Sequence, residues 1–286
     1  MSQSPIAWRE VRARLFRDLD TAGIEDAARE VRWLACHVLE TDASGLLLRE
    51  NLTAQELARL EQAVERRCAR EPAAFITGDA GFWTLSLAVS RETLIPRADS
   101  EALIEALLQM RPDRASVRSV LDLGTGTGCL LLAALSEYQE AIGIGVDLSP
   151  DAAVLAMRNA RANGLDKRCA CFAGSWDTAL DARFDVVLSN PPYIPRADLA
   201  GLMPEVRQYE PGRALDGGVD GLDAYRVIVS RLPDLLVPGG CAILEMGIGQ
   251  IDQVSALARG QGLAERGRWQ DLGGIARALV LEAPDA

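Results

Sequence analysis

The chain has 286 residues, of which 49% are hydrophobic and 25% are charged, so it can bury a full core in one large domain or two smaller ones. Its formal net charge of -11 argues against a non-specific nucleic-acid binder, because such proteins usually carry a basic surface. No apolar run reaches the roughly 18 residues that a membrane helix needs, and the N-terminal residues lack the apolar core of a secretory signal. The 6 cysteines lack metal-site spacing, and we interpret them as reduced thiols of a cytoplasmic protein.

Residues 1–72 are predicted to form a small helical domain. Thr53 followed by Glu56 has the spacing of a capping box and begins a helix that runs to about Arg70. The only histidine, His37, lies inside an amphipathic helix, so we interpret it as a surface or core-edge residue rather than a catalytic one. The first helix shows one apolar face at helical spacing, formed by Trp8, Val11, Leu15 and Leu19.

The stretch 73–97 is predicted to be a β-hairpin linker between two domains. Pro72 interrupts the helical pattern, and from Phe75 to Ile95 the chain is expected to be extended. The alternation is clearest where Phe82, Thr84 and Ser86 interleave with apolar neighbours.

Residues 98–286 alternate between strand and helix patterns, which predicts a parallel sheet with helices on both faces. Pro150 after Ser149 suits the first position of a helix. The tail, 263–269 and 276–282, is expected to close the sheet as a hairpin. The predicted strands are Ser119–Leu123, Ile142–Asp147, Cys169–Phe172, Phe184–Leu188 and Cys241–Met246, and the predicted helices are Asp99–Met110, Cys129–Tyr138, Pro150–Asn163 and Leu222–Leu236.

A glycine turn follows the first of these strands. Glycines let the backbone approach a ligand closely, and ligands bind at the carboxyl ends of strands in open α/β sheets. The spacing G-x-G-x-G of Gly124, Gly126 and Gly128 differs from the dinucleotide pattern G-x-G-x-x-G, which favours a nucleoside without pyrophosphate. The alternative is a tight turn between strand and helix with no ligand.

Two further strand ends carry candidate ligand-binding residues. Asp147 ends the second strand, where an acidic side chain can accept both ribose hydroxyls. Trp176 follows the third strand beside Asp177, and could flank a purine ring or be a plain core residue.

The fourth strand stops at Asn190-Pro191-Pro192-Tyr193. The prolines fix φ and remove two backbone donors, while Asn offers a carbonyl oxygen and an amide group. This loop could hold a planar group that carries an NH2, or it could be a simple turn, since Asn and Pro are common in turns.

Together these residues resemble the class I S-adenosylmethionine-dependent methyltransferases, whose amino-methylating members share the Asn-Pro-Pro-Tyr motif. The flanking segments resemble the PrmC/HemK family of protein-(glutamine-N5) methyltransferases, from about residue 72 to the end. These segments are Leu94-Ile-Pro-Arg97 with Glu101, Glu205-Val206, Tyr209-Glu-Pro211, Ala214 to Gly218, Asp220 to Leu222, Tyr225-Arg226 and Gly247-x-Gly-Gln250.

The resemblance implies a Rossmann-like fold with a mostly parallel seven-stranded sheet, and an N-terminal domain that docks release factors. It implies methylation of the glutamine in the Gly-Gly-Gln motif of peptide chain release factors. S-adenosyl-L-methionine would be converted to S-adenosyl-L-homocysteine, without a metal, a membrane or a direct nucleic-acid partner. The implied catalytic residues are Asn190, Pro191 and Tyr193, the substrate contacts Asn190, Pro191, Pro192 and Tyr193, and the cofactor contacts Gly124, Thr125, Gly126, Thr127, Gly128, Asp147, Trp176 and Asn190.

Our mechanistic hypothesis is that the Asn190 side-chain oxygen and the Pro191 carbonyl accept the two amide hydrogens of the glutamine, with Tyr193 against the amide plane. One departure from the family lies at 98–100, where Ala-Asp-Ser replaces the usual Pro-Glu-Thr. The glycine-rich segment 216–221 lacks the closing Glu of a calcium loop and is interpreted as a turn that shapes the pocket.

The sequence also allows three other functions. The first is glutamine methylation of a large-subunit ribosomal protein, and the second is adenine-N6 methylation of nucleic acid. The third is an adaptor that kept the fold without catalysis, against which the intact glycine turn, Asp147 and Asn190 argue.

Overall fold

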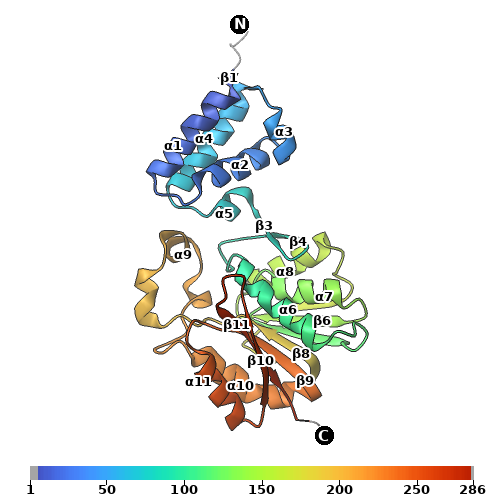
Figure 1. Ribbon diagram of the computed structural model, residues 1–286. Coiled ribbons are helices and arrows are strands. Elements are labelled where there is room, and N and C mark those ends of the chain that lie inside the picture. The colour runs from blue at the N-terminus through green and yellow to red at the C-terminus, as the bar shows by residue number, and fades with distance from the viewer. Residues whose placement is uncertain (1–5, 285–286) are drawn as a thin grey trace. The chain divides into compact units, whose positions relative to one another are not determined.

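The computed structural model describes residues 6–284, which fall into two compact units (Figure 1). The helical unit comprises the chain up to Asp79 together with a later segment, Met203–Tyr209. The sheet unit comprises Ala80–Leu202 and the chain from Glu210 onward. A search of the described residues finds no helix with the length and apolar character to span a membrane.

The helical unit is built around an apolar core from its first four helices. The predicted apolar face of the first helix is confirmed, since Trp8 and its partners at helical spacing are all buried. Thr53 and Glu56 form the predicted capping box, and His37 is exposed. The elements are β1 (Ile6–Ala7), α1 (Trp8–Thr21), α2 (Ala27–Val38), α3 (Ala43–Leu47), β2 (Asn51–Leu52), α4 (Ala54–Cys68), α5 (Ala73–Thr77) and α9 (Pro204–Tyr209).

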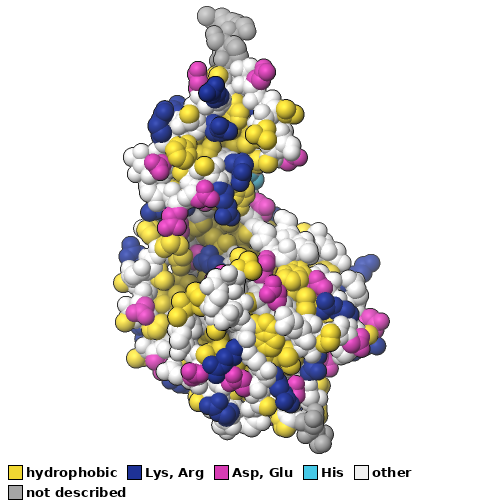
Figure 2. All heavy atoms as spheres, in the orientation of Figure 1, with side chains coloured by type: hydrophobic (Ala, Val, Ile, Leu, Met, Phe, Trp, Pro, Cys, Tyr) yellow, Lys and Arg dark blue, Asp and Glu magenta, His cyan; other side chains and the backbone are white. Residues whose placement is uncertain are grey.

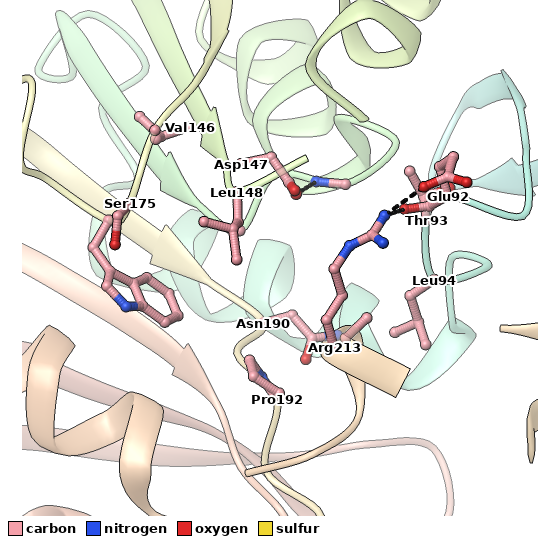
Figure 3. Close-up of a pocket in the computed structure, with 15 residues that line it drawn as sticks. Glu92, Thr93, Leu94, Val146, Asp147, Leu148, Ser175, Asn190, Pro192 and Arg213 are labelled. Carbon is pink, nitrogen blue, oxygen red and sulfur yellow. Dashed lines mark hydrogen bonds and ion pairs between the residues drawn. The ribbon is translucent and has the colours of Figure 1, made fainter. Parts of the chain in front are cut away.

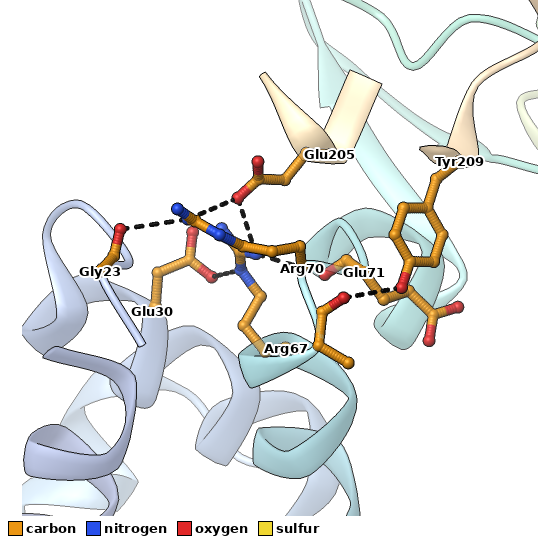
Figure 4. A network of polar contacts seen from close by, with 8 residues as sticks. Gly23, Glu30, Arg67, Arg70, Glu71, Glu205 and Tyr209 are labelled. Carbon is orange, nitrogen blue, oxygen red and sulfur yellow. Dashed lines mark hydrogen bonds and ion pairs between the residues drawn. The ribbon is translucent and has the colours of Figure 1, made fainter. Parts of the chain in front are cut away.

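Ion pairs hold α9 on this unit, although it lies far along the chain (Figure 4). Glu205 accepts from Arg67 at 3.1 Å and from Arg70 at 3.0 Å, and Arg67 is nearly buried. The Tyr209 hydroxyl donates to the backbone carbonyl of Ala69 at 2.8 Å. The segment Met203–Tyr209 is therefore anchored to α4 and the residues directly after it.

The expected extended chain from Phe75 is wrong for its first three residues. They belong to the short helix α5, because Pro72 is suited to the start of a helix and is followed by two helix-forming alanines. The hairpin itself is present as the two-stranded sheet of β3 (Asp79–Phe82) and β4 (Leu85–Ala88). The side chain of Asn159 bonds to both backbone groups of Ala88, at 2.8 and 3.0 Å, and so fixes β4 to α8.

The sheet unit contains a seven-stranded sheet in the order β10-β11-β9-β8-β5-β6-β7. Every strand except β11 runs in the same direction, since β11 is antiparallel to both β9 and β10. The predicted tail hairpin is confirmed, and β9 is longer than predicted at its start. The strands are β5 (Ser119–Leu123), β6 (Ile142–Asp147), β7 (Cys169–Ala173), β8 (Phe184–Ser189), β9 (Leu236–Glu245), β10 (Ala264–Gln270) and β11 (Ala276–Glu282).

Helices cover both faces of this sheet, as the alternating pattern predicted. One apolar core lies under α6, α7 and α8 and the other under α10 and α11 (Figure 1). The segment that lacks the usual proline forms a short 3-10 turn, η1 (Ala98–Ser100), directly before α6. The helices are α6 (Glu101–Met110), α7 (Cys129–Glu137), α8 (Pro150–Ala162), α10 (Asp223–Leu235) and α11 (Ile251–Gly260).

Candidate active site

The two motif-bearing loops leave the sheet from neighbouring strands. Strands β5 and β8 pair in parallel, with Leu123 opposite Ser189 at their carboxyl ends. The buried Ser189 hydroxyl donates to the Leu123 carbonyl at 2.6 Å. The glycine turn after β5 and the loop that begins at Asn190 therefore start side by side.

The glycine turn needs its glycines for two different physical reasons. Gly124, Gly126 and Gly128 all have positive φ, at 78°, 52° and 84°, which side-chain-bearing residues rarely adopt. A Cβ on Gly128 would also lie 3.2 Å from Leu132 and 3.3 Å from Ala156. The third glycine thus allows α7 to approach α8, whereas a Cβ on either of the first two would lie no closer than 3.9 Å to a neighbouring atom.

A pocket opens at this edge of the sheet (Figure 3). Both oxygens of Asp147 accept a backbone hydrogen bond, from Gly126 at 2.9 Å and from Ser149 at 2.8 Å, and each keeps a further acceptor position. Trp176 has a φ of 50°, a strained value for a bulky side chain and one that tends to occur at functional sites. Six predicted residues line the pocket: Gly124, Gly126, Asp147, Trp176, Asn190 and Pro192.

A smaller pocket adjoins the first and is lined by a buried carboxyl group, only one oxygen of which accepts a side-chain hydrogen bond. The two share Leu94, Gly124, Gly126 and Asn190. Asp122 lines the smaller pocket, and its Oδ2 accepts from the Thr125 hydroxyl at 2.7 Å. Its Oδ1 is buried and makes no hydrogen bond of normal geometry among residues 6–284, although the nearby backbone N–H of Leu131 lowers the pKa of the carboxyl. Burial raises the pKa of Asp122 to about 7, so a positively charged ligand group would both satisfy Oδ1 and favour the ionised carboxylate.

The Asn190 loop is held by a buried carboxylate at the end of β9. The amide nitrogen of Asn190 donates to the Ser100 hydroxyl at 3.2 Å, and Ser100 in turn donates to Glu245 Oε2. The Tyr193 hydroxyl donates to Glu245 Oε1 at 3.2 Å. Burial raises the pKa of both Glu245 and Tyr193.

The glycine-rich segment 216–221 packs against the backbone of this loop, which agrees with its interpretation as a turn that shapes the pocket. Ile194 exchanges backbone hydrogen bonds with Leu215 and Gly217, at 3.0 and 2.9 Å. A Cβ on Gly221 would lie 2.4 Å from the Tyr193 carbonyl oxygen, and its φ is 77°. The amide nitrogen of Gln250 donates to that same carbonyl at 2.8 Å.

Charged side chains order the rim of the pocket. Arg213, which follows the Asn190 loop, donates to the backbone carbonyl of Glu92 at 2.7 Å and to its carboxylate at 2.8 Å (Figure 3). Arg97 pairs with the buried Glu210, which also accepts from the backbone of Ile95 at 3.2 Å. The Leu94-to-Arg97 segment is thereby fixed beside the glycine turn.

The remaining predicted site residues lie nearby but do not line the larger pocket. Thr125 and Thr127 line the smaller one. Gly128, Pro191 and Tyr193 line neither of these two pockets, and Gly128 has the packing role described above.

Three residues of the site, Asp122, Ser100 and Glu245, were not predicted from the sequence. Asp122 carried a usable signal, since it interrupts an apolar strand and is almost fully buried. Glu245 shows the same pattern in β9. Ser100 had none, because its partner is 145 residues away along the chain.

Comparison with known proteins identifies relatives of this chain and supports its fold. Residues 10–78 match the family described as the PrmC N-terminal domain, and residues 97–201 match the methyltransferase small domain. A release factor glutamine methyltransferase of Rhodospirillum rubrum is 44% identical over 264 residues, which cover 92% of this chain and 81% of the relative. One of Geobacter sulfurreducens is 42% identical over 284 residues, with 98% of both chains covered.

A solved methyltransferase structure from Pyrococcus furiosus shares the fold at 15% identity. The alignment has a TM-score of 0.52 and covers 81% of this chain and 100% of the other. With the observed sheet order, these likenesses confirm the predicted class I methyltransferase fold.

We predict that Gly221→Ala lowers the free energy of unfolding by about 2 kcal/mol or more, because the new Cβ meets the Tyr193 carbonyl at a strained φ. Urea denaturation would measure this loss. Gly201→Ala is the matched control, since nothing lies within 4 Å of its Cβ, and it should change stability by less than about 0.5 kcal/mol. Equal effects of the two variants would contradict the close packing of this segment on the loop.

Proposed function

Since the chain belongs to the family of release factor glutamine methyltransferases, we propose that it methylates the side-chain amide nitrogen of the glutamine in the Gly-Gly-Gln motif of peptide chain release factors. The observation that carries this proposal is the hydrogen bonding of the Asn190 side chain. Asn190 lines both pockets; its amide nitrogen is bonded to Ser100, while its side-chain oxygen has no donor among the described residues. A free amide oxygen at the pocket suits a substrate that brings N–H donors.

The chemistry requires alignment more than base catalysis. A glutamine amide nitrogen is a weak nucleophile because its lone pair is delocalised into the carbonyl group. In the proposed mechanism, Asn190 Oδ1 and the Pro191 carbonyl accept the two amide hydrogens and so orient the nitrogen for in-line attack. As positive charge develops on that nitrogen, the two oxygens stabilise it. Tyr193 packs against the amide plane. The amide N–H becomes acidic only as the new C–N bond forms, and the methylated nitrogen then releases one of its two protons to water.

The pocket residues fit S-adenosylmethionine as the methyl donor. When bound, it supplies a methyl group that its sulfonium already activates. Asp147 retains acceptor positions for ribose hydroxyls, and Trp176 offers a flat apolar surface. The unpaired Oδ1 of Asp122 suits a ligand with two cationic groups, a sulfonium and an ammonium.

We infer that the helical unit docks the release factor through an apolar groove between α1, α2 and α3. Phe16 and Leu47 line it and are exposed. Arg12, Arg17 and Arg32 also line it, are exposed, and form no ion pair within residues 6–284. Figure 2 shows basic side chains among hydrophobic ones on the visible face of this unit. Unpaired arginines around an apolar groove suit an acidic segment that carries apolar side chains. The proposed reaction is cytoplasmic, because release factors act on ribosomes.

The direct test is a competition for labelled methyl groups. Purified release factor, a large-subunit ribosomal protein and duplex DNA are offered together with labelled S-adenosylmethionine, and mass spectrometry locates the product. We expect label on the glutamine of the Gly-Gly-Gln motif and none on duplex DNA, whose phosphates need a basic surface that this chain of net charge -11 does not suggest. Label on the ribosomal protein or on DNA would overturn the substrate assignment.

Asn190→Ala should reduce kcat by about 100-fold or more, because a substrate-aligning acceptor stabilises charge only in the transition state. The dissociation constant for S-adenosylmethionine should change far less, by less than about fivefold, a difference of about 1 kcal/mol. Steady-state kinetics and titration calorimetry measure the two quantities. A variant with near-normal turnover would refute the alignment mechanism.

Cofactor affinity should fall as the pH drops below about 7, since the raised pKa of Asp122 means that protonation there removes the charge that attracts a cation. Asp122→Asn should bind about tenfold more weakly at pH 8 and lose this pH dependence. Calorimetry measures the cofactor affinity at pH values from about 6 to about 8.5, a range that brackets the Asp122 pKa of about 7. The exposed Asp166→Asn variant serves as control, and a pH profile shared by all three proteins would contradict the role of Asp122.

Charge reversal in the groove, Arg17→Glu with Arg32→Glu, should raise KM for the release factor by about tenfold and leave kcat unchanged, because the groove is proposed to bind and not to react. The matched control reverses two exposed arginines of the same unit that do not line the groove, Arg9→Glu with Arg59→Glu. If this control raises KM equally, general charge and not this groove governs the encounter.

A further inference from the structure

Glu245 is a buried carboxylate that the alignment mechanism does not itself use. It ends β9, and both it and Ser100 are 1% exposed. Each of its oxygens accepts from a hydroxyl, Oε2 from Ser100 and Oε1 from Tyr193. The nitrogen of the Asn190 side chain donates to the same Ser100 oxygen, at 3.2 Å. A continuous chain of hydrogen bonds therefore links Glu245 to the residue proposed to hold the substrate.

The direction of each bond in this chain follows from the chemistry of its members. An ionised carboxylate only accepts hydrogen bonds, so the single proton of the Ser100 hydroxyl must point to Glu245. The Ser100 oxygen then has only lone pairs to offer to Asn190. The Asn190 amide must accordingly turn its NH2 group toward Ser100, and its carbonyl oxygen away from it. Without this chain, the two ends of an Asn side chain are nearly equal in shape.

We propose that Glu245 and Ser100 are positioning residues, which fix the orientation of the Asn190 side-chain amide so that its oxygen is presented to the substrate. This inference rests on the proposed function, in which that oxygen accepts a hydrogen of the glutamine amide. It also explains the substrate class. A reversed Asn190 would present its NH2 group to the NH2 group of the glutamine, and two donors repel each other.

Three neighbouring groups favour the ionised form of Glu245 that this polarity requires, and they act against burial, which raises its pKa. These groups are the two hydroxyl donors and Arg277 of β11. Arg277 is itself held by Asp99 and Asp271, at 3.1 and 3.0 Å.

A double-mutant cycle tests the proposal. Ser100→Ala and Glu245→Gln are each made alone and in combination with Asn190→Ala, and methyl transfer to the release factor is measured. Each single variant should lower kcat by about tenfold, while the dissociation constant for S-adenosylhomocysteine changes by less than about threefold. In the Asn190→Ala background neither change should lower kcat further by more than about twofold, because residues that act through one group are not additive.

A second readout does not depend on activity. The side-chain ¹⁵N amide resonance of Asn190, identified by its loss in Asn190→Ala, should shift in Ser100→Ala and persist unshifted in Ser100→Thr, which keeps the hydroxyl. Ser255→Ala is the matched control, because Ser255 is a buried serine that donates to Glu265 between α11 and β10. It should leave both kcat and the Asn190 resonance unchanged.

Two results would overturn the inference. One is an unshifted Asn190 resonance in Ser100→Ala, and the other is a loss of kcat that is as large in the Asn190→Ala background as in the wild type. These results differ from a failure of the proposed function, in which the wild-type protein transfers no methyl group to the release factor while the resonance still reports the orientation. If Glu245→Gln fails to fold, the Ser100 variants still show whether the orientation of Asn190 depends on this hydrogen-bond chain.

Discussion

The parallel pairing of β5 with β8 is the constraint on which the site depends. The strands that carry the two motifs are separated along the chain by β6, β7 and two helices, yet they are neighbours in the sheet. Because parallel strands end at the same edge, the turn of Gly124 and the loop of Asn190 must meet there. The hydrogen bond from Ser189 to Leu123 fixes their relative height. The site is thus a consequence of strand order.

Around that pairing, buried polar groups hold the Asn190 loop in one conformation. The prolines remove local alternatives, and the glycine-rich segment 216–221 contacts the loop backbone so closely that side chains would not fit. Glu245 accepts a hydrogen bond from Tyr193 of the loop directly, and it is linked to Asn190 through the hydroxyl of Ser100. In a family of enzymes that methylate a weakly nucleophilic amide, such rigidity is the expected source of rate, because the residues have no strong base to offer and act by alignment.

Local patterns were sufficient to predict most of the fold. The positions of the strands in the large sheet, the capping box at Thr53 and the closing hairpin could be predicted from periodicity and from Gly and Pro positions, although the start of β9 was not. The short helix α5 was missed, since the alternation begins only after it and Pro72 could end one helix or begin another. The membership of α9 in the helical unit depends on ion pairs between Glu205 and arginines more than 130 residues earlier in the chain, which no local pattern contains.

The residues of the site also divide into those with a local sequence signal and those that depend on distant contacts. Residues in motifs, such as Asp147 and Asn190, were predicted because their types and spacing carry chemistry. Ser100 and Glu245 were not predicted as site residues, because their importance arises from contact with each other and with Asn190 in the folded chain. Asp122 lies between these cases, because an acid within an apolar strand is visible in the sequence, whereas its unpaired oxygen is visible only in the structure.

The central claim is that Asn190 presents its side-chain oxygen to the glutamine amide of the substrate. A crystal structure with S-adenosylhomocysteine and a Gly-Gly-Gln peptide bound tests this most directly. If Asn190 aligns the substrate, the glutamine nitrogen lies about 3 Å from both Asn190 Oδ1 and the Pro191 carbonyl oxygen, and the Asn190 nitrogen stays bonded to Ser100. A glutamine whose carbonyl oxygen faces the Asn190 nitrogen, or one that lies outside the pocket, would contradict it.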